Sequence, residues 1–214
     1  MRAGQSQLAA DLLPEFSFAA PTSGTLDPAS LFVAPTRAVW LEVGFGSGEH
    51  LAAQAEAHPD IGFIGCEVFE NGIVRLIGAA ARQGLGNIRI FADDARKLLA
   101  VLPSASIARV FILFPDPWPK ARHRKRRLVA PATLDRLAQV MTDGAELRLA
   151  TDDPAYLAWM LEATTAHPAF AWTARRAGDW RTRPDDWPPT RYEEKARGAG
   201  RTPGFLSFVR RARE

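Results

Sequence analysis

The sequence predicts an α/β fold in which helices cover both faces of a doubly wound, mostly parallel sheet. Three observations carry this prediction. From residue 38 onward, short apolar runs alternate with helical stretches, as in βαβ units with right-handed crossovers. A glycine-rich turn joins the first apolar run to the first helix. Acidic residues follow the apolar runs at the carboxyl end of the expected sheet, where ligands bind in such folds.

The expected strands are short apolar runs, and the first of them is closed by glycines, which indicates a buried strand. Each later run follows a helical stretch and ends near an acidic or small residue. Five strands are expected at residues 39–43, 61–67, 88–92, 109–114 and 145–150, with weaker candidates at 170–173 and 205–210.

The helices are expected between these runs, at residues 49–58, 71–83, 95–102, 128–141 and 154–165. In the second of them, Ile73, Leu76 and Ile77 lie on one face, and Gly84 is placed to end it. Pro154 suits the first turn of the last helix, because proline lacks the N–H that this turn leaves unpaired.

Residues 1–37 are rich in Ala, Ser, Thr and Pro, and we expect them to form a weakly ordered N-terminal arm. Leu8, Leu12, Leu13 and Phe16 indicate one short helix within this arm. Residues 38–214 then form one domain, which is long enough to enclose a complete hydrophobic core.

Composition narrows the class of protein. The net charge of +3 permits a nucleic-acid partner without requiring one. Cys66 is the single cysteine and lies in an apolar run, which indicates an inert buried thiol and no intramolecular disulfide. We expect a cytoplasmic protein, because the sequence has no membrane-spanning stretch and no signal-peptide core. His50, His58 and His167 lack metal-ligand spacing, so no metal is expected.

The turn after the first strand holds Gly44, Gly46 and Gly48, and Glu42 lies two residues before the first of them. Glycines let the backbone turn tightly and approach a ligand closely. In the dinucleotide fingerprint the last glycine is spaced differently, and phosphates bind at the helix N-terminus. The present spacing is similar to the first motif of class I methyltransferases, although a plain tight turn would use the same glycines.

Two more acids follow the next strands. Glu67 ends the second strand, where an acidic side chain can accept hydrogen bonds from both ribose hydroxyls of an adenosine. The same residue would suit NAD, so Glu67 does not decide between the cofactors. Asp94 follows the third strand, where class I methyltransferases contact the adenine amino group. A helix N-cap is the alternative role for Asp94, and the neighbouring Asp93 competes for the contact.

The most informative segment covers residues 114–127. Asp116 lies between two prolines at the end of the fourth strand, so its backbone is held stiffly, and Trp118 follows. Six cationic residues then precede the next expected helix: Lys120, Arg122, Arg124, Lys125, Arg126 and Arg127. Because the macrodipole is positive there, such cations are unfavourable unless a polyanion binds. Phosphate contacts of this kind contribute affinity and position but no sequence choice. A solvated basic loop is the alternative.

This segment resembles the signature of the bacterial tRNA (guanine-N7)-methyltransferase family. The family's other motifs occur in the same order over about residues 39–208: residues 41–48, 63–67 and 87–94, Thr151-Asp152 with Tyr156, and 189–193 with Lys195. The resemblance implies a Rossmann-like class I methyltransferase domain with seven strands, the last of them antiparallel. The chain departs from the family at Ser47, where Met is common, and in its lack of a basic N-terminal arm.

The resemblance also implies a role for each matching position. S-adenosyl-L-methionine is the implied methyl donor, and tRNA is the implied substrate, methylated at guanine-46 of the variable loop. Cofactor contacts fall on Glu42, Gly44, Gly46, Gly48, Glu67, Asp94 and Asp116, and Asp116 matches the catalytic position as well. Substrate contacts fall on Lys120, Asp152, Thr190, Arg191, Tyr192 and Glu193. The tRNA backbone would contact Arg122, Arg124, Lys125, Arg126 and Arg127.

Guanine N7 carries a lone pair and needs no deprotonation before it attacks the methyl group of a sulfonium. Such an enzyme needs positioning and negative potential near the purine more than it needs a strong base. Asp116 could accept hydrogen bonds from guanine N1–H and the exocyclic amine, with Asp152 and Glu193 as candidates for the same edge. The target base must leave its stack to reach such a pocket.

Other functions fit parts of the pattern. A nicotinamide-dependent oxidoreductase has the same sheet, but its glycine spacing differs. A non-catalytic RNA-binding module would use the basic run, but the acids at the strand ends would repel RNA. A class I methyltransferase acting on another RNA remains an alternative. The sequence also leaves open whether the protein is a monomer or a homodimer, and whether Trp180 and Trp187 stack on bases or cover the core edge.

Overall fold

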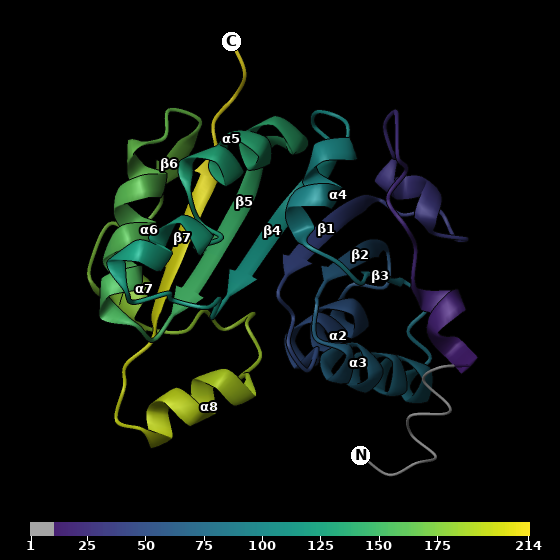
Figure 1. Cartoon of the computed structure of the whole chain (residues 1–214), viewed down its shortest axis with the longest axis horizontal. Helices are drawn as coiled ribbons and strands as arrows, with labels where there is room; N and C mark the ends of the chain where they lie inside the picture. The colour runs from purple at the N-terminus through teal and green to yellow at the C-terminus, as the bar shows by residue number, and fades with distance from the viewer. Residues whose placement is uncertain (1–10) are drawn as a thin grey trace.

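A computed structural model of the protein describes residues 11–214, which form a seven-stranded sheet in the order β3-β2-β1-β4-β5-β7-β6 (Figure 1). The strands are β1 (Ala38–Val43), β2 (Ile61–Cys66), β3 (Ile88–Phe91), β4 (Ile107–Leu113), β5 (Met141–Thr151), β6 (Phe170–Trp172) and β7 (Gly204–Arg210). Strands β1 to β5 pair in parallel, whereas β7 pairs antiparallel with both β5 and β6. The predicted doubly wound sheet with an antiparallel last strand is confirmed.

Helices cover both faces of this sheet. They are α2 (Glu49–Ala57), α3 (Glu70–Gln83), α4 (Ala95–Val101), α5 (Pro131–Val140), α6 (Pro154–Ala166), α7 (Gly178–Arg181) and α8 (Arg191–Gly198). Two 3₁₀ helices, η1 (Pro28–Leu31) and η2 (Ala121–Arg126), lie in the connections. The short α8 lies beyond the carboxyl ends of β4 and β5 (Figure 1). Within residues 11–214, no helix is both long and apolar enough to cross a membrane.

Alternation along the central strands divides the core into two clusters. In β1, Val39, Leu41 and Val43 join the cluster beneath α4, α5 and α6, whereas Trp40 joins the cluster beneath α2 and α3. Successive strand residues point to opposite faces of a sheet, so a strand buried on both faces is apolar throughout. This is why the short apolar runs of the sequence predicted these strands.

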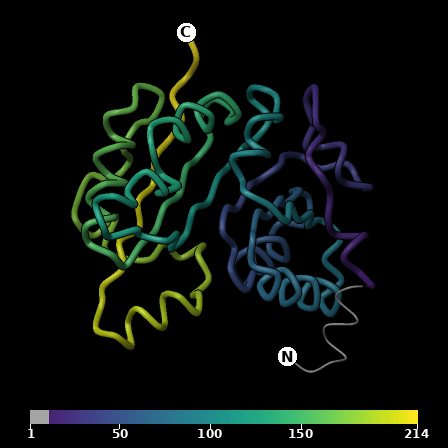
Figure 2. The backbone as a smooth tube through the Cα atoms, viewed as in Figure 1, coloured from purple at the N-terminus to yellow at the C-terminus, as the bar shows by residue number. Residues whose placement is uncertain are grey.

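Residues 11–37 pass along the outer edge of β3 (Figure 2). Residues 11–16 are helical, in agreement with the predicted short helix, of which Leu8 lies outside the described residues. Ser17 forms an isolated bridge with Ile90, and Phe18 N donates to Ile90 O over 3.1 Å. Phe16 packs against one core cluster and Phe18 against the other. This stretch therefore covers the edge strand, which would otherwise expose unpaired backbone groups.

The prediction of a helix over 128–141 is wrong at both ends. Residues 127–130 are not helical, and Ala130 is extended because helical geometry is disfavoured for the residue before a proline, here Pro131. The helix therefore starts at Pro131, which fits a first turn. At the other end, Met141 is buried and already belongs to β5. The two weaker strand candidates are confirmed as β6 and β7.

Candidate functional site

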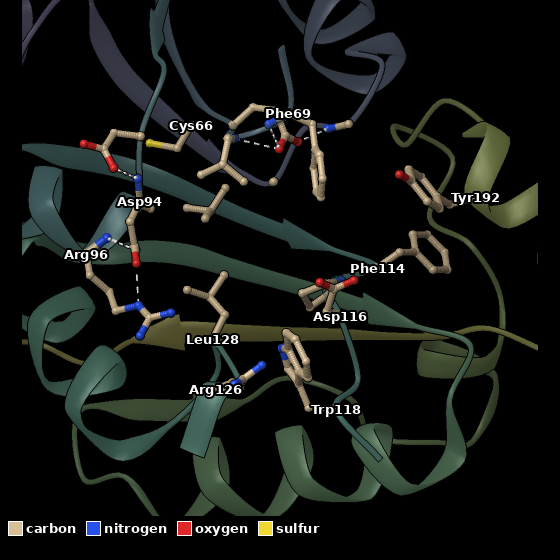
Figure 3. Close-up of a pocket in the computed structure, with 18 of the residues that line it drawn as sticks. Cys66, Phe69, Asp94, Arg96, Phe114, Asp116, Trp118, Arg126, Leu128 and Tyr192 are labelled. Carbon is tan, nitrogen blue, oxygen red and sulfur yellow. Dashed lines mark hydrogen bonds and ion pairs between the residues drawn. The ribbon is translucent and has the colours of Figure 1, made fainter. Parts of the chain in front are cut away.

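A cavity of about 570 Å³ opens at the carboxyl ends of β1, β2 and β4 (Figure 3). That volume lies within the range of small-molecule sites, which are commonly clefts of ~300–1,000 Å³. The cavity is lined by Val43, Gly44, Gly46, Cys66, Glu67, Val68, Phe69, Asp93, Asp94, Ala95, Arg96, Phe114, Pro115, Asp116, Trp118, Lys125, Arg126, Leu128 and Tyr192. Residues that are far apart in the sequence, from Val43 to Tyr192, thus meet in one place.

The glycine turn after β1 forms one wall of this cavity. Gly44 and Gly46 line it with φ angles of +75° and +58°, a backbone region that glycine adopts without strain. A Cβ atom on Gly46 would come within 2.8 Å of Tyr192 Cε2, so this glycine also makes room for the α8 side chain. Gly48 packs against α3 instead, where a Cβ atom on this residue would lie 2.7 Å from Leu76 Cδ1. Of the three glycines, Gly48 therefore serves helix packing.

Glu67, at the end of β2, is held by backbone amides. Its Oε2 accepts a hydrogen bond from Gly46 N over 2.8 Å, and its Oε1 accepts from Val68 N over 2.7 Å and Phe69 N over 3.0 Å. These bonds fix the carboxylate at the cavity wall. Val68 and Phe69 beside it are 63% and 69% exposed, which is unusual for apolar side chains. The acid and the apolar pair together suit a nucleoside, which has sugar hydroxyls and a flat ring.

Asp93 and Asp94 both reach the cavity, and their contacts distinguish them. Asp94 caps α4, and its Oδ1 accepts from Arg96 N over 2.9 Å and from Arg96 Nε over 3.2 Å. Asp93 forms an ion pair of 2.7 Å with Lys97, and the hydrogen bond from this lysine is the main reason that the pKa of Asp93 is lowered. The predicted N-cap role of Asp94 is confirmed, and the cavity wall holds both carboxyls.

Asp116 lies on a strained loop at the end of β4, where its side chain faces the cavity beside Trp118 (Figure 3). Phe114 and Trp118 have φ angles of +52° and +44°, which non-glycine residues seldom adopt. Such conformations persist only where the surrounding structure holds them. Within the described part of the chain, the exposed carboxylate of Asp116 has no hydrogen-bond or ion-pair partner, so it remains available to a ligand.

Glu42 lies behind the cavity wall and does not line it. Its side chain is 3% exposed, and its Oε2 lies 2.7 Å from Nδ1 of the equally buried His50. Trp187 packs beside this pair, with its ring centroid 6.2 Å from that of His50. Direct contact between Glu42 and a ligand therefore has no support from the geometry. Trp187 is 2% exposed in the core, which decides in favour of covering the core edge rather than base stacking.

Helix α8 brings one of its predicted substrate residues to the cavity. Tyr192 lines it, whereas Thr190 caps the helix by accepting from Glu193 N over 3.2 Å. Arg191 forms an ion pair with Glu49 of α2, with 3.9 Å between Nε and Oε1. Glu193 is buried and forms ion pairs with two arginines, Arg197 at 2.9 Å and Arg183 at 3.3 Å.

Asp152, at the end of β5, likewise has a protein partner. Its Oδ2 lies 3.0 Å from Nε of Arg201, which follows α8. Neither Asp152 nor Glu193 lines the cavity. Asp152 instead joins the segment after α8 to the end of β5, and Glu193 joins α8 to Arg183 while also pairing with Arg197 within the helix.

The predicted cationic segment separates into an exposed group and one buried member. The exposed group comprises Lys120, Arg122, Arg124, Lys125 and Arg126. Lys125 and Arg126 also line the cavity, so this positive surface continues into it. Arg127 is 4% exposed and hence cannot share the surface with the others. The prediction that Arg127 contacts a tRNA backbone lacks support for this reason.

Sequence reasoning missed one residue that shapes the site. A Cβ atom on Gly72, in the first turn of α3, would lie 2.0 Å from the carbonyl oxygen of Gly46. The helix therefore packs directly on the glycine turn. The available signal was a glycine inside a helical stretch, which usually has a packing or functional reason. Cys66 also reaches the wall, but burial raises the pKa of its thiol, which keeps it uncharged and unreactive.

Comparison with known proteins agrees with this geometry. A family model described as "Putative methyltransferase" matches residues 36–204. Among solved structures, the 16S rRNA (adenine(1408)-N(1))-methyltransferase from Catenulisporales acidiphilia has a TM-score of 0.58 at 18% identity, over 92% of this chain and 99% of that one. The 16S rRNA methyltransferase KamB has a TM-score of 0.57 at 16% identity, over 83% and 89%. These two show a shared fold.

Two sequence relatives are much more similar. The chain is 54% identical to the tRNA (guanine-N(7)-)-methyltransferase of Paramagnetospirillum magneticum, over 95% of this chain and 85% of the relative. It is 49% identical to the protein of the same name from Rhodospirillum rubrum, over 100% of this chain and 85% of the relative. The chain therefore belongs to the tRNA (guanine-N(7)-)-methyltransferase family.

Proposed function

We propose that this protein transfers a methyl group from S-adenosyl-L-methionine to N7 of a guanine in tRNA. One observation carries the proposal: the carboxylate of Asp116, which has no partner among residues 11–214, faces a cavity lined by groups that suit a nucleoside and by cations. Relatives at 54% and 49% identity carry the name of this activity. The chain would work where tRNA is found, in the cytoplasm.

The cavity wall around β1, β2 and α4 fits the methyl donor. Glu67 would accept a hydrogen bond from a ribose hydroxyl, since backbone amides hold its two oxygens at the wall and leave room for one more donor. Gly44 leaves open space, because a Cβ atom there would meet nothing within 4 Å. Val68 and Phe69 would cover the adenine, with Asp94 near its amino group. When bound, S-adenosyl-L-methionine supplies a methyl group on a positively charged sulfur.

Asp116 would act on the guanine. The N7 atom already has a lone pair, so no group has to remove a proton before the methyl transfer. A carboxylate beside the purine would orient it through N1–H and the exocyclic amine, and it would offset the positive charge that methylation leaves. The strained, proline-flanked loop suits this task, because a stiff backbone keeps the carboxylate in one place.

The exposed cations beside the cavity would bind the RNA. Lys120, Arg122, Arg124, Lys125 and Arg126 would contact phosphates, which position a nucleic acid without reading its sequence. Guanine-46 is the proposed target among the guanines of tRNA, on the resemblance alone. Asp152 and Glu193 remain candidates for the guanine edge, but Asp152 would have to leave one arginine and Glu193 two before binding the base. Tyr192 already stands at the cavity and needs no such exchange.

Methyl transfer from tritium-labelled S-adenosyl-L-methionine into unmodified bulk tRNA, followed by nucleoside analysis, tests this function. We expect the label to appear as 7-methylguanosine. Label in ribosomal RNA alone, or in a different tRNA nucleoside, would keep the fold but move the activity to another substrate or atom. Failure to bind S-adenosyl-L-methionine would overturn the methyltransferase assignment itself.

A further inference from the structure

Arg127 turns inward from an otherwise exposed basic segment. Its neighbours Arg126 and Leu128 both line the cavity, whereas Arg127 itself is 4% exposed and absent from the lining. It directly follows η2, the 3₁₀ helix that carries the exposed cations, and its N–H donates to Arg124 O over 3.0 Å. A charged side chain is rarely buried without a partner, so its contacts indicate its role.

The contacts of Arg127 lead to the loop that carries Asp116. Its Nε donates a hydrogen bond of 2.9 Å to the carbonyl oxygen of Pro117, the residue after Asp116. The guanidinium also lies over two aromatic rings of α6, with its central carbon 4.9 Å from the Tyr156 centroid and 5.2 Å from the Trp159 centroid. Guanidinium groups stack favourably on such rings. Arg127 thus joins the Asp116 loop to α6.

The aromatic partners are themselves fixed. Val129 N donates to the Tyr156 hydroxyl over 3.2 Å, and Trp159 Nε1 donates to Val129 O over 2.7 Å. Both rings are therefore tied to the chain two residues after Arg127. The guanidinium thus contacts two fixed rings and the carbonyl oxygen of Pro117.

Charge supports this placement. Burial raises the pKa of the Tyr156 hydroxyl, the positive charge of Arg127 opposes that rise, and the negative charge of Asp116 adds to it. The charges of Arg127 and Asp116 thus shift the pKa of the same hydroxyl in opposite senses. Trp118, on the other side of Pro117, has the guanidinium of Arg126 over its ring at 4.9 Å. Two successive arginines therefore hold the strained loop, one from the solvent side and one from inside.

We propose that Arg127 is a positioning residue for Asp116 and not an RNA-binding cation: its bond to the Pro117 carbonyl, held by the Tyr156 and Trp159 rings, keeps the strained loop in place. This proposal rests on the proposed function, because it assigns Asp116 to the methyl-transfer site. A lysine could not replace the arginine in this role. Lysine offers a point charge that binds phosphate well, but it has no planar face to stack between rings.

The test compares Arg127→Gln and Arg127→Lys with two matched controls. Arg124→Gln removes an exposed cation of the proposed RNA surface, and Arg176→Gln removes an exposed arginine that pairs with Asp179. For each protein we would measure the binding constant for tRNA at several salt concentrations, the binding constant for S-adenosyl-L-methionine, the kcat of methyl transfer and the melting temperature.

The salt dependence separates the two roles. A cation that neutralises a phosphate contributes about 1 to the slope of log K against log salt, so Arg124→Gln should lower the slope by about that amount. Arg127→Gln and Arg127→Lys should keep the wild-type slope and bind S-adenosyl-L-methionine within about twofold of the wild type. Their kcat should fall roughly 10- to 100-fold, as expected when a reacting group is misplaced by about 1 Å. Arg176→Gln should resemble the wild type throughout.

Two results would overturn the proposal. The first is a lower salt slope for Arg127→Gln combined with wild-type kcat for Arg127→Lys, which is the behaviour of a phosphate contact. The second is a lower melting temperature with unchanged kcat, which is the behaviour of a merely structural residue. If Arg127→Gln does not fold, Arg127→Lys alone decides through its kcat. If the wild type forms no 7-methylguanosine, the proposed function falls, while the salt slopes still show whether Arg127 contacts phosphate.

Discussion

Substitution of Gly72 by alanine should displace the glycine turn and weaken binding of S-adenosyl-L-methionine. An alanine Cβ at this position would lie 2.0 Å from the carbonyl oxygen of Gly46, where ordinary contact begins at 3.4 Å. The backbone must therefore yield by about 1.4 Å, the difference between these distances. The blocking atom is backbone and not the end of a flexible side chain, so no rotamer change relieves the contact.

This displacement acts on the proposed cofactor wall, since Gly46 N donates to Glu67 and both residues line the cavity. In catalysis a misplacement of about 1 Å can cost on the order of 100-fold in rate, and we expect a loss of similar or smaller size where the contacts of a cofactor are displaced. We therefore expect the dissociation constant for S-adenosyl-L-methionine to rise roughly 10- to 100-fold, equivalent to a loss of about 1.4–2.8 kcal/mol of binding free energy. Overpacking should also lower the free energy of unfolding by about 1–3 kcal/mol.

Gly78 in the same helix provides the matched control. A Cβ atom at Gly78 would meet only the end of the Arg82 side chain, at 3.3 Å, and that end can move. Because alanine is the better helix former, Gly78→Ala should raise stability by about 0.5–1 kcal/mol and leave cofactor binding unchanged. Titration calorimetry and chemical denaturation would measure both effects. Wild-type cofactor binding by Gly72→Ala would refute the argument that α3 sets the position of the glycine turn.

Three further predictions concern the site, the core and the pH dependence. Asp116→Ala should lose most turnover yet keep much of the tRNA affinity in a filter-binding assay; unchanged kcat would contradict its role. Trp187→Ala should cost about 3–5 kcal/mol of unfolding free energy by denaturant titration, because this side chain is 2% exposed; a cost below about 1 kcal/mol would be inconsistent with that burial. Asp143→Asn should be less stable than the wild type at neutral pH. A hydrogen bond from Arg213 N lowers the pKa of Asp143 in the folded protein, so the ionised carboxylate stabilises the fold at pH values above 3.8, the ordinary pKa of this group. In thermal melts this difference should vanish as the pH falls well below 3.8, and its persistence there would disprove the assignment.

The sheet could be predicted because its strands are buried on both faces, so each appears as a continuous apolar run such as residues 39–43. The carboxyl ends of such strands meet at one edge, which is why Glu67, Asp94 and Asp116 were expected together and all line the cavity. The start of α5 could not be read from its apolar pattern, because the backbone restriction before Pro131 overrides that pattern.

The direction of individual side chains could not be predicted. Arg126 and Arg127 are adjacent in a basic run, yet the first lines the cavity and the second is buried against α6. That difference depends on the aromatic rings of α6, which are far away in the sequence. In the same way, the burial of Glu42 follows from the position of His50 on α2, and the sequence around Glu42 does not show it. The closeness of Gly72 to the glycine turn is a further consequence of packing.

Two tRNA transcripts that differ at one kind of atom provide a direct test of methylation at N7. One contains guanosine, and the other contains 7-deazaguanosine, in which a C–H group replaces N7 and removes its lone pair. We predict that the guanosine transcript accepts labelled methyl groups as 7-methylguanosine, whereas the deaza transcript binds with similar affinity and accepts none. Equal labelling of both transcripts would contradict N7 as the target atom and, with it, the role assigned to Asp116.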